Sequence, residues 1–119
     1  MPQFSTKSKD RLATCENDLI TLFNEVIKDY DCTIIEGHRS MERQKALYRE
    51  GKSKTLGSNH LSFPSKAVDV MPYPVDWDDH LGQHRFATQV YKKAIELGIE
   101  VRWGGNFKTF YDAPHWELL

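Results

Sequence analysis

The sequence is poor in cysteine, which limits how the fold can be held together. It has two cysteines among 119 residues, and Cys15 and Cys32 do not form a CxxC pair. This number excludes both a disulfide framework and a cysteine-rich zinc knuckle. We therefore expect two free, buried or half-buried thiols in a protein of a reducing compartment.

An excess of charge of one sign and long hydrophobic runs are also missing. The chain has 16 Lys+Arg against 17 Asp+Glu, a formal net charge of −1. This balance gives no long-range attraction to nucleic acid or to an anionic membrane, so we expect neither partner. The longest stretch without a charged residue, Thr55 to Ser65, is too short and too polar to insert into a membrane.

The N-terminus carries no recognisable export signal. Residues 1–7 lack the cationic start and apolar run of a secretory signal peptide. We therefore expect a protein that is made and folded in the cytosol and needs help to reach anything outside the cell.

The rest of the composition fits an ordinary globular domain, with 39% hydrophobic and 28% charged residues. The length suits one domain over residues 1–119, and no repeat or linker divides it. A chain of this mass should bury about two-thirds of the surface that its unfolded form exposes. A self-sufficient core is therefore expected. We also expect a monomer.

Hydrophobic periodicity predicts helix over the first third of the chain. Apolar residues recur at steps of three and four from Leu12 to Ile27. Ser8 is a plausible cap, and Thr14 marks a point where the helix could break and restart. The β-branched run 33–35 then predicts a buried strand.

The same signals predict the remaining elements. They are a helix over 41–49 capped by Ser40 and stopped by Gly51, a loop over 52–66, a strand over 67–71, a helix from about 80 to 97 closed by Gly98, and strands at 99–103 and 115–119. The order helix-strand-helix-strand-helix-strand-strand indicates an α+β fold with a small antiparallel sheet flanked by helices.

One cluster has the spacing of a metal site on a helix. His80 and His84 are four residues apart and could grip one ion from the same helix face. However, Gly82 lies between them, and no acid is interleaved as in H-E-x-x-H. We interpret this segment, with its three preceding aspartates, as a solvated helix N-terminus; the aspartates are Asp76, Asp78 and Asp79.

Two further clusters, His60 with Asp69 and Asp112 with His115, indicate a metal site when they are considered together. A hydrolytic zinc site commonly uses two histidines and one carboxylate, and it needs a second carboxylate to take a proton from water. The residues that could supply these groups are His60, Asp69, His115 and Asp112. Asp69 lies in an otherwise apolar run, where an unpaired carboxylate would cost several kcal/mol, so a metal or cationic partner would explain it. By spacing alone, each of these histidines is more often a structural residue than a ligand.

A rival motif can be excluded. His115-Trp116-Glu117 resembles half of a zinc deaminase signature, but no P-C-x-x-C follows it.

Several ordered motifs, from about Cys32 to the C-terminus, carry a family resemblance. They are Gly37-His38-Arg39-Ser40 with Gln44 and Leu47-Tyr48, Gly51-Lys52-Ser53-Lys54-Thr55, Ser58-Asn59-His60, Ala67-Val68-Asp69, Gly104-Gly105-Asn106-Phe107 and Asp112-Ala113-Pro114-His115-Trp116-Glu117-Leu118. In these motifs the chain resembles the phage endolysin and bacterial L-alanyl-D-glutamate peptidases of the zinc D-alanyl-D-alanine metallopeptidase superfamily.

The resemblance implies a hedgehog/D,D-peptidase-like fold and a role for each matching residue. Zn²⁺ would be bound by His60, Asp69 and His115. Asp112 would be the general base, and Arg39 would polarise the scissile carbonyl or hold the oxyanion, a task that suits a fixed, forked cation. Gln44 and Ser58 would shape the site or contact the substrate.

The sequence departs from the family pattern in one place. The family reads Ser-x-His-x-x-Gly-x-Ala-x-Asp, whereas the step from His60 to Asp69 is nine residues and Ser65 stands in the glycine position. Because the lengthened 61–66 segment is a loop, we expect both ligands still to converge. Three aromatics near the C-terminus are candidates for either pocket walls or core, namely Trp103, Tyr111 and Trp116.

The implied activity is cleavage between L-alanine and D-glutamate in the stem peptide of bacterial peptidoglycan. Two alternatives stay open: a D-alanyl-D-alanine carboxypeptidase or dipeptidase on the same metal site, and a non-catalytic zinc-stabilised binding module. An endolysin without a signal peptide would wait in the host cytoplasm until the membrane is breached and then act on the wall.

Overall fold

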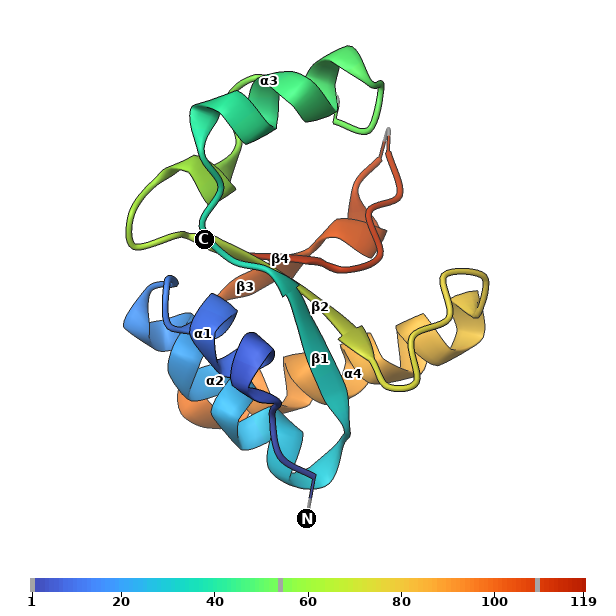
Figure 1. The fold of residues 1–119 in the computed structure, drawn as a ribbon. Coiled ribbons are helices and arrows are strands. Elements are labelled where there is room, and N and C mark those ends of the chain that lie inside the picture. Colours follow the sequence, from blue (N-terminus) through green and yellow to red (C-terminus); the bar gives the residue numbers. More distant parts are fainter. Residues whose placement is uncertain (1, 54, 109) are drawn as a thin grey trace.

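The structure, a computed structural model, describes residues 2–53, 55–108 and 110–119, so Lys54 of the Gly51–Thr55 motif lies outside the described residues. In chain order the elements are α1 (Thr6–Leu12), α2 (Asn17–Asp29), β1 (Cys32–Glu36), α3 (Met41–Arg49), the 3₁₀ turn η1 (Asn59–Leu61), β2 (Ala67–Pro72), α4 (His80–Leu97), β3 (Val101–Trp103), η2 (Gly104–Asn106) and β4 (His115–Leu118) (Figure 1). The predicted order of helices and strands is confirmed, and the first helical region is split in two.

The prediction of Ser8 as a helix cap is wrong. Ser5 caps α1 by accepting a hydrogen bond from the backbone N–H of Ser8 at 3.1 Å. The Ser8 hydroxyl is buried and accepts from the N–H of Ile34 in β1. Thr14, in the turn before α2, likewise accepts from the N–H of His38. Both hydroxyls therefore tie the first helices to β1 and the turn that follows it.

The other helix ends follow the predicted signals. Ser40 caps α3 by accepting from the Arg43 N–H. Gly98 ends α4 with a left-handed φ of 71°, a conformation that glycine adopts without a Cβ penalty. The N–H of Ile99 is bonded to a carbonyl of α4, and for this reason β3 begins at Val101 and not at residue 99 as predicted.

The sheet has four strands in the order β1-β2-β4-β3, and every pair is antiparallel, as predicted. Helices α1, α2 and α4 gather on one side of it, whereas α3 and the loop after it stand apart on the other (Figure 1). β2 lies between β1 and β4, and its register places Asp69 directly opposite His115. The topology thus brings together residues that are far apart in the sequence.

The hydrophobic core lies between the sheet and α2 and α4. Its members include Leu19, Leu22, Phe23, Val26, Val68, Val70, Val90 and Trp116. Trp103 and Trp116 are buried and stack at 6.0 Å, so these two aromatics belong to the core. Both cysteines are free and buried, as expected, and burial raises the pKa of Cys15 to about 11 and that of Cys32 to about 12.

No helix among the described residues is long and apolar enough to cross a bilayer.

Candidate metal centre and active site

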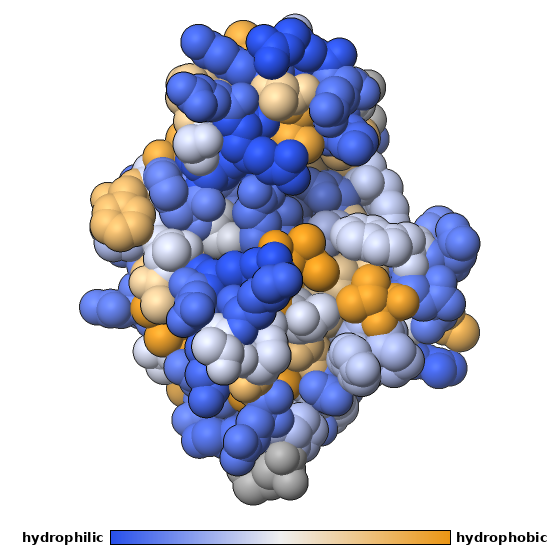
Figure 2. Space-filling view, viewed as in Figure 1, coloured by the Kyte–Doolittle hydropathy of each residue, from blue (hydrophilic) through white to orange (hydrophobic). Residues whose placement is uncertain are grey.

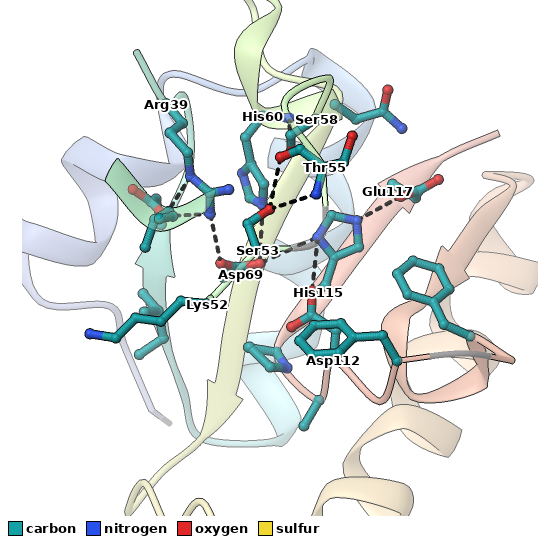
Figure 3. A pocket seen from close by; sticks show the side chains of 18 of the residues that line it. Arg39, Lys52, Ser53, Thr55, Ser58, His60, Asp69, Asp112, His115 and Glu117 are labelled. Atoms are coloured by element: carbon teal, nitrogen blue, oxygen red, sulfur yellow. Dashed lines mark hydrogen bonds and ion pairs between the residues drawn. The ribbon is translucent and has the colours of Figure 1, made fainter. Parts of the chain in front are cut away.

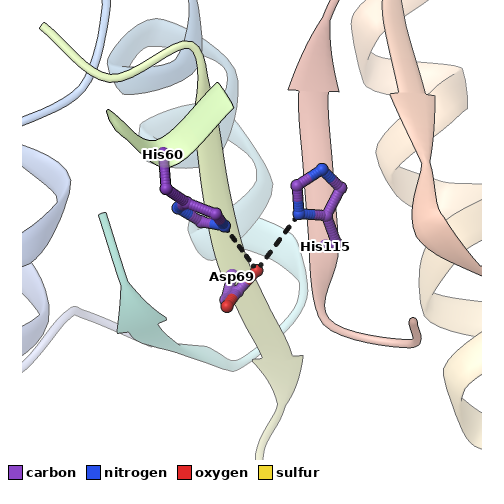
Figure 4. A group of neighbouring side chains, drawn as sticks. All are labelled: His60, Asp69 and His115. Carbon is purple, nitrogen blue, oxygen red and sulfur yellow. Dashed lines mark hydrogen bonds and ion pairs between the residues drawn. The ribbon is translucent and has the colours of Figure 1, made fainter. Parts of the chain in front are cut away.

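Three potential metal ligands meet on the face of the sheet that points toward α3. Asp69 comes from β2, His115 from β4 and His60 from η1. The Asp69 Oδ1 atom is 3.1 Å from Nε2 of His60 and 3.5 Å from Nδ1 of His115 (Figure 4). One donor atom from each residue lies within 4.8 Å of the others. Over residues 2–53, 55–108 and 110–119, this is the one such group of histidine, cysteine or acidic residues that could hold an ion.

In each imidazole, the ring nitrogen that faces away from Asp69 is hydrogen-bonded to another oxygen. Nδ1 of His60 is 2.7 Å from the carbonyl oxygen of Gly37, and Nε2 of His115 is 2.6 Å from Oε1 of Glu117. Since both oxygens can only accept, we assign the ring hydrogens to these nitrogens. The other nitrogens then turn their lone pairs toward the Asp69 carboxylate. This arrangement is repulsive unless a cation lies between the three groups.

The residues present therefore fit a zinc ion. Two imidazole nitrogens and one carboxylate oxygen are a common zinc ligand set, with a further position for water or substrate. The hydrogen bonds from the ring N–H groups to Gly37 and Glu117 fix the orientation of the rings, as outer-shell partners do at metal sites.

The pKa values of Asp69 and His115 are shifted in the directions that favour a negative carboxylate beside a positive charge. Burial raises the pKa of Asp69, but its interactions with the rings of His115 and His60 outweigh burial and hold the pKa below its usual range. Burial lowers the pKa of His115, and the bonds to Asp69 and Glu117 outweigh this and raise it to about 9. A proton on His115 therefore supplies positive charge between the carboxylates of Asp69 and Glu117.

The loop between His60 and Asp69 explains how a longer spacer still brings both ligands together. Both of its ends are tied down: the Lys66 N–H donates to the Asn59 carbonyl, and the Ser65 N–H donates to the Thr14 carbonyl. Ser65 is buried, and its hydroxyl donates to the Ala67 carbonyl. The extra length projects outward, where the Phe63 side chain is exposed. The expected convergence of the His60 and Asp69 side chains is confirmed.

Asp112 lies in the loop that enters β4, beside His115. Its Oδ2 atom is 3.9 Å from Nδ1 of His115, and a third of its side chain is exposed. Burial, followed by the negative charge of Asp69, raises the pKa of Asp112. Gly104 allows this loop to approach closely, because a Cβ there would collide with the Asp112 carbonyl oxygen. Asp112 is thus a partly desolvated carboxylate next to the ligand group.

Arg39, from the turn after β1, faces the opposite side of Asp69. Its Nη2 atom is 3.6 Å from Oδ2 of Asp69, and its backbone N–H donates to the His60 carbonyl. Nε and Nη2 donate to Oε1 of Glu36 at 3.0 and 2.6 Å, and Nη1 donates to Oε1 of Gln44 at 2.8 Å. This bonding holds the guanidinium in one orientation. It also gives hydrogen-bond partners to a cation that is only 9% exposed.

The structure places Gln44 and Ser58 differently with respect to the cavity. Gln44 is fully buried, and its amide also donates to the Ser53 hydroxyl and the Thr55 carbonyl, so it connects Arg39 to the loop after α3. Ser58 caps η1 by accepting from the His60 N–H and lines the cavity.

These groups surround one cleft of about 790 Å³. Six of the seven predicted site residues line it, and Gln44 lies behind its wall. Figure 3 shows Arg39, His60, Asp69, Asp112 and His115 directed toward one another. In Figure 2 the surface is hollowed beneath the α3 lobe, which is dominated by hydrophilic residues.

Sequence reasoning missed two acidic residues in this site. Glu36 orients Arg39, and no motif indicated it. Glu117 accepts from His115 and from Arg102, whose Nη2 atom is 2.7 Å away; the bond from His115 is the first cause of its lowered pKa of about 2. Residues 115 and 117 lie on the same face of a strand, so strand periodicity could have identified this pairing.

The helix-borne histidine cluster forms no metal site with a third ligand among the described residues. Nδ1 of His84 is 2.7 Å from the His80 carbonyl, and both rings contact the ring of Tyr111. His80 and Tyr111 line the cleft. The aromatic candidate Tyr111 is therefore a wall residue, unlike Trp103 and Trp116.

Comparison with known proteins agrees with the fold. A family model described as phage L-alanyl-D-glutamate peptidase matches residues 1–119. The chain is 27% identical over 105 residues to the peptidoglycan L-alanyl-D-glutamate endopeptidase CwlK of Bacillus subtilis (strain 168), covering 77% of this chain and 63% of CwlK. It thus spans a little under two-thirds of that relative.

The crystal structure of the L-Ala D-Glu endopeptidase ChiX of Serratia marcescens superposes with a TM-score of 0.85 at 34% identity, covering 98% of this chain and 90% of ChiX. The resemblance deduced from the motifs and the α+β fold class are confirmed. The chain belongs to the phage L-alanyl-D-glutamate peptidase family.

Proposed function

We propose that this chain is a zinc-dependent endopeptidase that cleaves the bond between L-alanine and D-glutamate in the stem peptides of bacterial peptidoglycan. The family model and the names of CwlK and ChiX support the reaction. The observation that carries the metal assignment is the convergence of His60, Asp69 and His115, with two imidazole lone pairs directed at one carboxylate.

A zinc ion bound there would polarise the scissile carbonyl and lower the pKa of a water molecule toward neutrality. Asp112 takes the proton of the attacking water on its carboxylate and returns it to the D-glutamyl nitrogen as the carbon–nitrogen bond breaks. Its raised pKa suits this exchange, because the carboxyl group must both accept and release a proton. Arg39, held by Glu36, directs fixed positive charge at the developing oxyanion.

The remaining residues shape the cleft. Gln44 holds the guanidinium of Arg39 and the loop after α3 in a fixed relation, and Ser58 fixes the turn that carries His60. We propose that residues 1–119 form the catalytic domain and act as a monomer. We also propose that the protein acts on the wall after release from the host cytoplasm through a breached membrane.

The decisive experiment is digestion of purified peptidoglycan followed by mass spectrometry and identification of new amino termini. We expect D-glutamate as the new terminus and a stem peptide freed from the glycan, and we expect a chelator to abolish both. Release of terminal D-alanine alone would instead identify a D-alanyl-D-alanine carboxypeptidase or dipeptidase. Zinc binding without any hydrolysis would identify a binding module.

A further inference from the structure

The cleft has two chemically different sides. On the α3 side, Arg43 and Lys52 line it with cationic side chains that are 55% and 70% exposed. On the side formed by the start of α4 and the loop before β4, aromatic rings line it, and Arg102 lies over the ring of Phe107 at the edge of this side. We call the second side the aromatic wall and define it as Trp77, His80 and Tyr111.

The aromatic wall is exposed but firmly built. Trp77 is 55% exposed and Tyr111 is 39% exposed. Gln83, only 2% exposed, supports both from behind: its Nε2 donates to the Trp77 carbonyl at 3.1 Å, and its Oε1 accepts from the Tyr111 hydroxyl at 2.6 Å. The ring of His80 lies 5.3 Å from that of Tyr111. One buried amide thus joins two loops that are distant in the sequence and holds the backbone of Trp77 and the ring of Tyr111 at the cleft.

The chemistry of the proposed substrate is just as asymmetric. On the carbonyl side of the scissile bond, L-alanine is attached through a lactyl group to a muramyl sugar; these two units span about 7 Å when extended. On the amine side, D-glutamate carries a free carboxylate, and further carboxylates follow along the stem peptide. A molecule bound across the reacting groups must therefore place a saccharide on one side of the cleft and anionic groups on the other.

Charge complementarity indicates which side of the cleft binds the anionic peptide and which binds the saccharide. The anionic part of the stem peptide matches the side with Arg43 and Lys52, two exposed cations whose present partners, Glu36 and Glu50, lie at 3.5 and 3.6 Å. The aromatic wall carries no lysine or arginine, and flat, partly exposed rings with polar edges suit the apolar face of a sugar ring. We infer that the aromatic wall of Trp77, His80 and Tyr111 is a subsite for the muramyl saccharide of the substrate. This inference rests on the proposed function.

The test compares two substrates in each protein: a disaccharide-bearing muropeptide and the same stem peptide without sugar. For wild type we expect a higher kcat/KM on the sugar-bearing substrate. In Trp77→Ala the ratio of the two kcat/KM values should fall about three- to tenfold, the size of one lost aromatic contact. Trp77→Phe, which keeps a ring, should retain most of the ratio. Tyr30→Ala, an exposed tyrosine outside the cleft lining, is the matched control and should keep the wild-type ratio.

A binding measurement covers the case in which Trp77→Ala fails to fold. In the wild-type protein, titration with the peptide-free disaccharide should shift the indole N–H signal of Trp77 in NMR spectra and leave the signals of the buried Trp103 and Trp116 in place. An unchanged ratio in folded Trp77→Ala, or an unmoved Trp77 signal, would overturn the subsite. Either result could occur while wild type still cleaves the L-alanyl-D-glutamate bond. The subsite can therefore be refuted while the proposed function stands.

Discussion

The bond between His115 and Glu117 gives a quantitative prediction about the metal centre. Glu117 accepts from Nε2 of His115 at 2.6 Å and from Arg102 at 2.7 Å, and it is 8% exposed. In Glu117→Ala the ring of His115 loses the partner that keeps Nδ1 directed at Asp69. Removing such an outer partner typically weakens metal binding by 10- to 100-fold, about 1.4–2.8 kcal/mol.

Graded variants separate orientation from charge. In Glu117→Gln the side-chain carbonyl can still accept from His115, so we expect a smaller loss of zinc affinity than in Glu117→Ala. Arg102→Ala removes only the outer partner, which is 53% exposed, and should have the weakest effect. Zinc affinity is measured by competition with a chromophoric chelator, and circular dichroism verifies the fold. A folded Glu117→Ala protein that binds zinc within twofold of wild type would refute the reasoning.

Three further predictions concern the proposed reaction and the metal-free state. Asp112→Ala should keep its zinc, measured by metal analysis, and lose at least about 100-fold in wall hydrolysis because the proposed proton acceptor is removed; retained activity would remove Asp112 from that role. Arg39→Lys should lower kcat by about 10- to 100-fold, because an ammonium cannot reproduce the forked contacts to Glu36 and Gln44; steady-state kinetics on a soluble muropeptide measure this, and an unchanged kcat would contradict it. Without metal, the raised pKa of His115 stabilises the fold fully below its ordinary value of 6.5, and this stabilisation is lost as the pH rises through about 9. The Tm of chelator-treated protein should therefore fall across that range, whereas a Tm that stays level or rises would contradict the assignment.

Local signals in the sequence predicted the parts of the fold that depend on local chemistry. Ser40 and Gly98 mark helix ends because capping and left-handed backbone are properties of single residues. Ser8 failed as a cap because its hydroxyl is used by Ile34, a partner 26 residues away that no local pattern reveals. The strand that carries Asp69 was predictable because residues 67–71 form an apolar run, and Asp69 is the one acid in that run.

The meeting of His60, Asp69 and His115 was predictable from motifs, whereas the partners that support these residues were not. Glu36 and Gln83 act through side-chain bonds to residues in other segments, and only the folded chain shows these pairs. Glu117 is the exception, since its alternation with His115 on one strand was readable. The histidines of α4 had the spacing of a metal site, but tertiary packing against Tyr111 gives them a different environment.

The most direct test of the central claim is a zinc titration of metal-free protein while wall digestion is followed. We predict that hydrolysis returns in proportion to zinc and reaches its maximum at one ion per chain, with D-glutamate as the new amino terminus. His115→Ala should bind no stoichiometric zinc and show no recovery. Full cleavage by metal-free protein, or a new terminus other than D-glutamate, would contradict the account.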